Sequence, residues 1–198
     1  MEFIHGENLI LKDKKSIFID KTVKIGNNVT IYENNRIEGN TVIGDNTILY
    51  PNNCISDAII GENCKAGPYS RLRPNTVLKN NVSVGNFVEV KNSTIGNGSK
   101  ANHLAYVGDC DIGENCNIGC GVIFVNYNGK IKQRSLIGNN CFIGSNCNII
   151  APVNIQSNSY ICAGTTITKD VNEGDFIIGR VRQEVKEGRA KDYLKERK

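Results

Sequence analysis

Apolar residues recur along this chain with a period of six, and this spacing defines the elements that the sequence predicts. The repeat runs from Ile19 to Ile167, with three steps of five and one gap of thirteen after Phe124. An α-helix requires apolar residues three and four apart, and a half-buried strand requires strict alternation. Very short strands joined by regular corners explain a six-residue period instead. The pattern therefore predicts an all-β protein, a parallel β-helix.

The polar residues between the apolar positions have turn chemistry. Glycine follows many of the apolar residues and asparagine stands three residues after them, as in Ile25-Gly26-Asn27-Asn28 and Ile43-Gly44-Asp45-Asn46. Asparagine tolerates the left-handed backbone conformation that a tight corner requires. Pro51, Pro68 and Pro74 each stand two residues after an apolar position. These residues predict the corners of the coils.

The period divides the chain into three parts. Residues 19–172 are predicted to form one elongated β-helix domain, in which a loop at 125–136 interrupts the coils. Residues 1–18 are expected to be a lead-in, either a first strand or a cap. Residues 173–198 are a charged tail, for which a short amphipathic helix broken at Gly188 and a solvated chain are both open interpretations.

Charge and hydropathy narrow the class of protein. The formal net charge of the chain is +4, and residues 180–198 alone hold eight Lys or Arg and four Asp or Glu. The body before Arg180 therefore sums to zero, so we expect no basic face for nucleic acid. No apolar stretch approaches 18 residues and the first residues do not resemble a signal peptide. We expect a soluble, cytoplasmic protein that does not bind a membrane.

Eight cysteines raise the possibilities of a disulfide framework and of a metal site. Cys64, Cys116, Cys141 and Cys147 all stand four residues after an apolar position, where other repeats have valine or threonine. Buried cysteine behaves as a small hydrophobe at such a position. No Cys-x-x-Cys pair is present, and we predict that these cysteines fill the core rather than bind metal.

Residues outside the repeat form a series of motifs in fixed order. The longest run from Gly67 to Pro74, from Val84 to Lys91 and from Gly98 to Asp109, followed by Asn126-Tyr127 and Gly179-Arg180-Val181. The series resembles the acetyltransferase half of the bacterial bifunctional N-acetylglucosamine-1-phosphate uridyltransferase and glucosamine-1-phosphate acetyltransferase, one of the hexapeptide-repeat acyltransferases. This resemblance implies a left-handed parallel β-helix. No nucleotide-binding loop precedes the repeat, so uridyltransferase activity is not expected.

The resemblance assigns roles to particular side chains. Acetyl transfer from a thioester to an amine needs a base for the amine proton, and histidine is the side chain that titrates near neutral pH. The resemblance implies that His103 is this base and that Arg73 and Lys91 hold a sugar phosphate. The substrate contacts that it implies are Arg73, Lys91, Tyr106, Asn117 and, from a neighbouring subunit, Lys132. The coenzyme contacts that it implies are Cys120, Asn126, Tyr127, Ser145, Ala163 and Arg180.

Simpler interpretations of the same residues stay open. His103 is also compatible with a structural corner, and the loop with Lys130, Lys132 and Arg134 with a solvated excursion. Cys120 stands where the family usually has alanine, and it is either a neutral replacement or a reactive thiol beside the thioester. Asn102 and Asn128 replace a glycine and an aspartate of the family pattern.

The sequence thus predicts a homotrimeric N-acetyltransferase that uses acetyl-CoA and needs no metal. Its expected reaction gives N-acetylglucosamine 1-phosphate from glucosamine 1-phosphate, a step toward UDP-N-acetylglucosamine and the cell wall. The alternatives are transfer to another amino sugar, for example a nucleotide-linked one, and a non-catalytic β-helix scaffold. A hexapeptide-repeat carbonic anhydrase is set aside, because its zinc needs three histidines and His5 and His103 are the two present.

Overall fold

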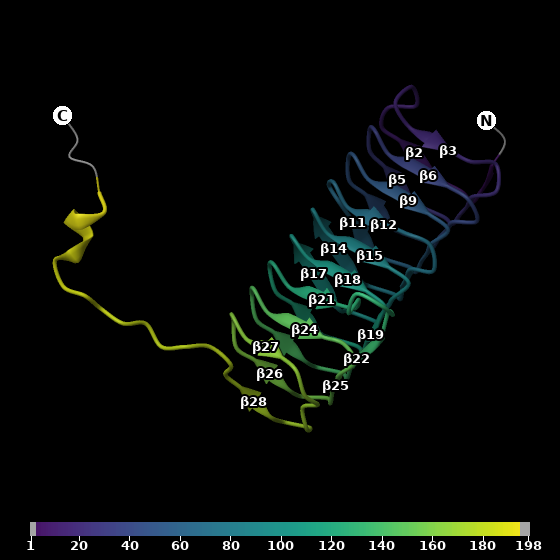
Figure 1. Ribbon diagram of the computed structural model, residues 1–198. Helices are drawn as coiled ribbons and strands as arrows, with labels where there is room; N and C mark the ends of the chain where they lie inside the picture. Colours follow the sequence, from purple (N-terminus) through teal and green to yellow (C-terminus); the bar gives the residue numbers. More distant parts are fainter. Residues whose placement is uncertain (1–2, 195–198) are drawn as a thin grey trace.

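A three-sided prism of parallel β-strands makes up the body of the protein (Figure 1). A computed structural model describes residues 3–194. From β1 to β27 successive strands go to three sheets in turn, so a strand pairs with strands one coil before and one coil after it. We name the sheets A, B and C in the order in which the chain enters them.

Sheet A contains nine strands and sheet B ten, all in sequential order along the prism. Sheet A consists of β1 (Ile4–His5), β4 (Lys24–Ile25), β7 (Val42–Ile43), β10 (Ile59–Ile60), β13 (Val77–Leu78), β16 (Thr94–Ile95), β19 (Cys110–Ile112), β22 (Ser135–Ile137) and β25 (Asn154–Ile155). Sheet B consists of β2 (Ile10–Leu11), β5 (Thr30–Ile31), β8 (Ile48–Leu49), β11 (Lys65–Ala66), β14 (Ser83–Asn86), β17 (Lys100–His103), β20 (Asn117–Ile118), β23 (Phe142–Ile143), β26 (Tyr160–Ile161) and β28 (Phe176–Ile177).

Sheet C contains the remaining nine strands. They are β3 (Phe18–Ile19), β6 (Arg36–Glu38), β9 (Cys54–Ser56), β12 (Arg71–Leu72), β15 (Glu89–Lys91), β18 (Tyr106–Gly108), β21 (Ile123–Val125), β24 (Asn148–Ile150) and β27 (Thr166–Ile167). The corners that lead from sheet B to sheet C form one edge of the prism, called here the BC edge. Those that lead from sheet C to sheet A form the CA edge.

The core is a column of the apolar residues that set the six-residue period. In β4 and β7 the first side chain faces outward and the second, Ile25 or Ile43, is buried. Each buried residue lies on its counterpart in the next coil, because parallel strands pair in register through the whole prism. The predicted apolar positions are thus the inner positions of the coils. Phe124 is among the largest side chains that are fully buried.

Asparagine takes the predicted place at the corners. Asn28, Asn46 and Asn63 have φ between 54° and 57°, the left-handed region that asparagine adopts more readily than most residues. Pro51 and Pro68 precede further left-handed corner residues, as the sequence indicated. The corners therefore follow directly from local sequence.

Both ends of the prism lie outside the range that the period marks. At the first end, β1 and β2 lie within residues 1–18, and they pair with β4 and β5 of the next coil. The period misses them because His5 occupies the inner position of β1 and eight residues separate Leu11 from Ile19. At the other end β28 pairs with β26, and Gly174 takes the left-handed conformation that asparagine takes elsewhere.

The tail after β28 extends away from the prism (Figure 1). Its regular structure within the described residues is one 3₁₀ turn, Arg189–Asp192, preceded by Gly188 with φ of 67°. Val181, Val185 and Tyr193 are exposed. The described part of the tail thus has exposed side chains and one short turn, and residues 195–198 lie outside the described residues.

The cysteines of the core are free thiols. Cys64, Cys116, Cys141 and Cys147 are buried, with exposed fractions of 2% or less, so they fill the core as the sequence indicated. Their Sγ atoms lie within hydrogen-bonding distance of backbone oxygens, for example Cys64 Sγ and Lys79 O at 2.9 Å. Burial raises the pKa of the Cys64 thiol, as expected for a structural cysteine.

No helix in residues 3–194 is long and apolar enough to cross a membrane.

Candidate functional site

Polar side chains gather on the CA edge in the middle of the prism, where the coils are shortest. Asp57, Asn92 and Asp109 occupy left-handed corners there, with φ between 46° and 49°. They correspond to the three five-residue steps of the repeat, each of which removes one residue from a corner. The next coil has the long loop 126–134 at the same edge. Short corners beneath a long loop leave a place where side chains from several coils meet.

The loop closes on itself through local hydrogen bonds. Tyr127 and Lys132 form an antiparallel bridge, and the backbone N–H of Gln133 donates to the carbonyl oxygen of Asn126 at 2.8 Å. At its tip the side-chain oxygen of Asn128 accepts from the N–H groups of Lys130 and Ile131, both at 3.0 Å. The loop is therefore a small hairpin rather than a loose excursion.

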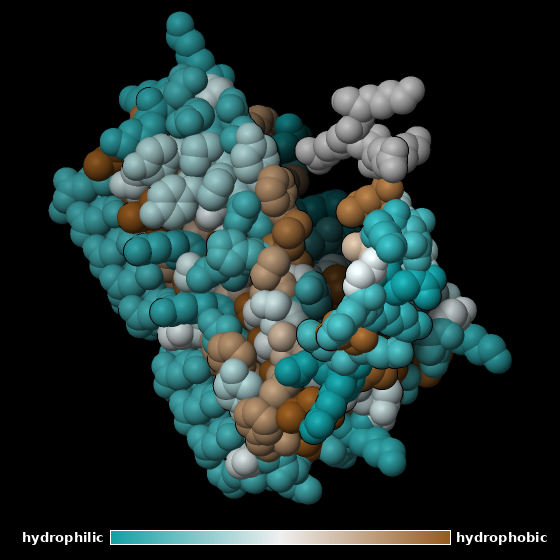
Figure 2. All heavy atoms as spheres, turned by 90° about the vertical axis from the view of Figure 1, so that its left-hand side faces the viewer, coloured by the Kyte–Doolittle hydropathy of each residue, from teal (hydrophilic) through white to brown (hydrophobic). Residues whose placement is uncertain are grey.

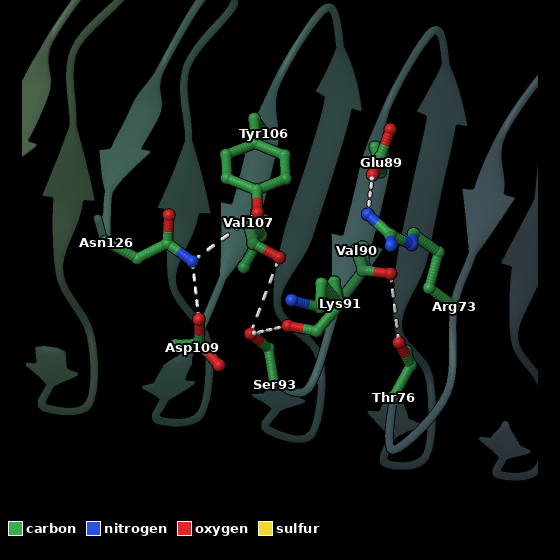
Figure 3. A network of polar contacts seen from close by, with 10 residues as sticks. All are labelled: Arg73, Thr76, Glu89, Val90, Lys91, Ser93, Tyr106, Val107, Asp109 and Asn126. Carbon is green, nitrogen blue, oxygen red and sulfur yellow. Dashed lines mark hydrogen bonds and ion pairs between the residues drawn. The ribbon is translucent and has the colours of Figure 1, made fainter. Parts of the chain in front are cut away.

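Arg73 and Glu89 form an ion pair below this loop. The Arg73 Nη1 atom lies 2.8 Å from Glu89 Oε1, and the two side chains are 35% and 32% exposed (Figure 3). Glu89 begins β15 on the outer face of sheet C, whereas Arg73 directly follows β12 at the CA edge. Because both side chains are half-buried, the pair orients the guanidinium and leaves other donors free for an anion.

Lys91 and Lys132 meet at the same edge. The pKa of Lys91 lies below its ordinary value, first because its amine is within hydrogen-bonding reach of Lys132, and then through partial burial and the positive charge of Lys132. The carboxylate of Asp109 acts in the opposite direction and Arg73 in the same direction as Lys132. Two neighbouring cationic amines attract an anion.

Asp109 lies near Lys91 and Lys132. It is 7% exposed, and its two carboxylate oxygens accept hydrogen bonds from the side-chain amides of Asn92 and Asn126, both at 2.5 Å. Burial by itself raises the pKa of this carboxyl. The hydrogen bonds from the two amides and the charges of Lys91 and Lys132 outweigh burial and lower the pKa below its ordinary value. Asp109 is therefore a carboxylate at neutral pH.

Tyr106 lies on sheet C between the two edges. It begins β18, and its hydroxyl accepts from the side-chain amide of Asn126 at 3.4 Å, so the ring spans the strand toward the CA edge (Figure 3). A Cβ atom on Gly108 would come within 2.4 Å of that hydroxyl. Glycine at 108 therefore leaves the space in which the tyrosine lies.

His103 is at the BC edge, at the end of β17. Its side chain is exposed, and Nδ1 lies 3.2 Å from the side-chain oxygen of Asn86 in the coil before it. When Nδ1 carries the proton and donates to that oxygen, Nε2 keeps its lone pair. The two residues line a shallow depression together with Tyr50, Pro68, Gly85 and Asn102.

Coils after His103 place the other predicted residues in a column on the BC edge. Cys120 is half-buried, whereas Ser145 and Ala163 are exposed. The Arg180 guanidinium donates through Nη1 to the backbone oxygen of Ala163 at 3.0 Å. Small residues at these corners leave the backbone open to a ligand along this edge.

An apolar ridge lies beside His103 on the same edge. Tyr69, Phe87 and Leu104 occupy the corner positions where asparagine or glycine is usual, with φ between 46° and 58° and exposed fractions between 53% and 57%. The rings of Tyr69 and Phe87 stack at 5.5 Å. Large residues adopt this conformation rarely and at a cost, so their repetition in three coils indicates a functional surface. Figure 2 shows apolar surface running along the side of the prism from which the tail departs.

The structure thus brings some predicted residues together and separates others. Lys91, Tyr106, Asn126 and Lys132 form one cluster with Arg73 beside it, whereas His103, Cys120, Ser145, Ala163 and Arg180 follow the BC edge. Asn117, in β20 on sheet B, pairs with Lys100 of the coil that contains His103. Sequence reasoning did not select Glu89, Asn86 or Asp109, although all three lie in the quoted motifs.

Two family models match parts of the chain. Residues 134–169 match the model described as bacterial transferase hexapeptide (six repeats), and residues 4–84 match the GMPPB C-terminal domain. Among solved structures, the UDP-N-acetylglucosamine acyltransferase of Arabidopsis matches with a TM-score of 0.63 and 18% identity, over 87% of this chain and 66% of that one. LpxA from Acinetobacter baumannii matches with a TM-score of 0.57 and 17% identity, over 83% and 69%. At such identities these likenesses show the fold alone.

The repeat and the fold define the chain as a hexapeptide-repeat protein with a left-handed parallel β-helix, as predicted. More particularly, it is similar to the bifunctional protein GlmU. It is 45% identical to GlmU of Clostridium kluyveri over 197 residues, which cover 91% of this chain and 43% of that protein. It is also 45% identical to GlmU of Clostridioides difficile, over 93% of this chain and 43% of that protein. The predicted resemblance is confirmed, and the chain spans less than half the length of these relatives.

Proposed function

We propose that this chain is an N-acetyltransferase that moves the acetyl group of acetyl-CoA to the amine of glucosamine 1-phosphate. The observation that carries the proposal is the polar cluster on successive coils, in which Arg73, Lys91 and Lys132 present cationic groups at one edge. A phosphate monoester is the complementary ligand, since guanidinium and ammonium groups bind phosphate oxygens. The similarity to the bifunctional protein GlmU is in keeping with the family resemblance from which this substrate is expected.

His103 is the proposed general base. When Nδ1 carries the proton and faces Asn86, Nε2 keeps a lone pair that is able to take the proton of an attacking amine. The amine then attacks the thioester carbonyl, a new C–N bond forms, and the C–S bond breaks to release the CoA thiol.

The BC edge is the proposed coenzyme surface. Cys120, Ser145 and Ala163 are small enough for the pantetheine arm to lie against the backbone, and Arg180 supplies a charge for a CoA phosphate. Asn126 and Tyr127 lie at the CA edge instead. The two groups meet when the CA edge of one copy faces the BC edge of another, the arrangement expected of a homotrimer with sites between subunits. Within one copy, Lys132 lies beside Lys91 of its own chain.

Replacing Arg180 by alanine should weaken acetyl-CoA binding about fivefold, the scale of one exposed charge contact. The change is measured as the Kd for acetyl-CoA by titration calorimetry. The control is Arg182→Ala, which removes an exposed charge two residues further along the tail. Equal Kd values for the two variants would exclude Arg180 from the coenzyme surface.

Substrate binding should weaken at alkaline pH. The lowered pKa of Lys91 means that this amine loses its charge at lower pH than an ordinary lysine. The KM for glucosamine 1-phosphate is therefore expected to rise at a lower pH than the titration of an ordinary lysine would give, and Lys91→Met should have a high KM that varies less with pH. A KM of the native chain that stays constant up to the range of free lysine would contradict this.

The proposed function is tested by release of the CoA thiol from acetyl-CoA in the presence of glucosamine 1-phosphate, glucosamine 6-phosphate or a nucleotide-linked amino sugar. Release with glucosamine 1-phosphate alone supports the proposal. If the CoA thiol is released only with another acceptor, that acceptor is the substrate and the proposed acetyl-transfer chemistry still holds. Folded protein that does not bind acetyl-CoA would favour a non-catalytic scaffold.

A further inference from the structure

We propose that Asp109 is a positioning residue that holds the loop 126–134 and the paired lysines in their working geometry. Among residues 3–194 it is the only buried residue with a carboxyl side chain, and it lies at the CA edge where the chain turns the corner from β18 to β19. This inference rests on the proposed function for its kinetic consequences. Its structural part stands on contacts alone.

Asp109 joins three successive coils. Asn92 donates to one carboxylate oxygen from the coil before, and Asn126 donates to the other from the coil after. The side chains thus form a ladder, Asn92–Asp109–Asn126, along the edge. A carboxylate suits the middle position because it has two acceptors and no donor, while each amide presents N–H groups toward it. A neutral amide in the middle would place one NH₂ group against another.

The backbone of Asp109 fixes the other end of the loop. Its carbonyl oxygen accepts from the N–H of Ser135 at 3.1 Å, and its own N–H donates to the carbonyl oxygen of Lys91, also at 3.1 Å. Asn126 is the first residue of the loop and Ser135 the first after it. One residue therefore holds both ends of the hairpin, and it is connected directly to Lys91.

Asp109 also supplies the negative charge that offsets the positive charges of Lys91 and Lys132. Lys91 and Lys132 repel each other, Arg73 adds to the repulsion, and Glu89 is already paired with Arg73. The Asp109 carboxylate is the group that favours the charged form of Lys91. Loss of its charge should let the amines separate or deprotonate, and either change weakens an anion site.

The test compares Asp109→Asn with Asp57→Asn. Asp57 is the matched control because it occupies a left-handed corner of the same edge, with φ of 46° against 49°, and its carboxylate accepts only from a backbone N–H, that of Asn40 at 2.9 Å. Asparagine is compatible with both backbone positions. Asn92→Gly is a second variant, which removes one amide and keeps the charge of Asp109.

The first readout is independent of activity. Trypsin should cut the loop after Lys130 and Lys132 about tenfold faster in Asp109→Asn than in the native chain or in Asp57→Asn, because the loop opens more often when its Asn126 end loses the contact with the carboxylate. Mass spectrometry of the fragments identifies these sites. Asn92→Gly should show a smaller increase. Equal cleavage in all four proteins would overturn the proposal, even if one variant also loses stability elsewhere.

The second readout is kinetic. For Asp109→Asn we expect a KM for glucosamine 1-phosphate about tenfold higher with kcat nearly unchanged, the scale of one charge-assisted contact. In Asp109→Asn the rise of KM at alkaline pH should begin at a lower pH than in the native chain. In Asn92→Gly it should begin at the same pH as in the native chain. An unchanged KM and pH profile would overturn the positioning role. If Asp109→Asn is cleaved faster but the native chain does not acetylate glucosamine 1-phosphate, the structural role of Asp109 stands and the proposed function is rejected.

Discussion

Replacing His103 by alanine should lower kcat for acetyl transfer by a factor of about 100 to 10,000, the range that a positioned general base contributes. His103 is exposed at the end of β17, and its Nδ1 atom faces the side-chain oxygen of Asn86. Alanine cannot take the proton of the amine, so the attack on the thioester is left to the unassisted amine. The rate is measured as release of the CoA thiol at saturating acetyl-CoA and glucosamine 1-phosphate.

His5 provides the matched control for this experiment. It is the other histidine of the chain, it is exposed, and it lies in β1 at the opposite end of the prism from the coenzyme column. His5→Ala should leave kcat unchanged. If His103→Ala retains the native kcat while acetyl-CoA binding is intact, a different group removes the proton and His103 is a structural corner residue.

Replacing Phe124 by alanine should lower the free energy of unfolding by about 3 to 5 kcal/mol, the usual cost of removing a buried aromatic ring. Phe124 is 1% exposed and lies in β21, directly before the loop 126–134. The aliphatic residues of neighbouring coils are held by in-register strand pairing and cannot move into the space. The effect is measured by urea denaturation followed by circular dichroism.

Phe142→Ala is the control, because it removes the same ring from the outer face of sheet B. Phe142 is 37% exposed and stacks on Tyr160 at 4.6 Å, so its loss should cost about 0.5 to 1.5 kcal/mol. Coils of a repeat protein can unfold in parts, and comparison of the two variants in the same buffer avoids reliance on a single two-state value. Equal losses in the two variants would contradict the placement of Phe124 in the core.

The ends of the fold show where a sequence period stops being informative. A period of six identifies a coil only when an aliphatic residue fills every inner position, and His5 fills that position in β1. At the other end ten residues separate Ile167 from Ile177, so β28 has no signal in the period. Pairing with β26 stabilises it nonetheless, because a strand gains its hydrogen bonds from a neighbour and not from its own composition.

The candidate site shows the same limit. The resemblance to a known family selected His103, Arg73 and Lys91 by motif, but it did not select Asp109, although Asp109 ends one of the same motifs. The partners of Asp109 are Asn92 and Asn126, each seventeen residues away. Such a contact is visible only when the coil length is known at every corner, and the five-residue steps are the signal that would have pointed to it.

By itself the sequence determined the repeat, the inner positions and the corners, because each depends on local properties: one apolar side chain per short strand and an asparagine or glycine at each left-handed residue. The tertiary structure decided which side chains meet. Stacking of the coils brings Lys91, Asp109 and Asn126 to one edge and leaves His103 with Asn86 on the other. Those meetings depend on the register between coils, which is set by strand pairing and corner length over the whole prism rather than by any single segment.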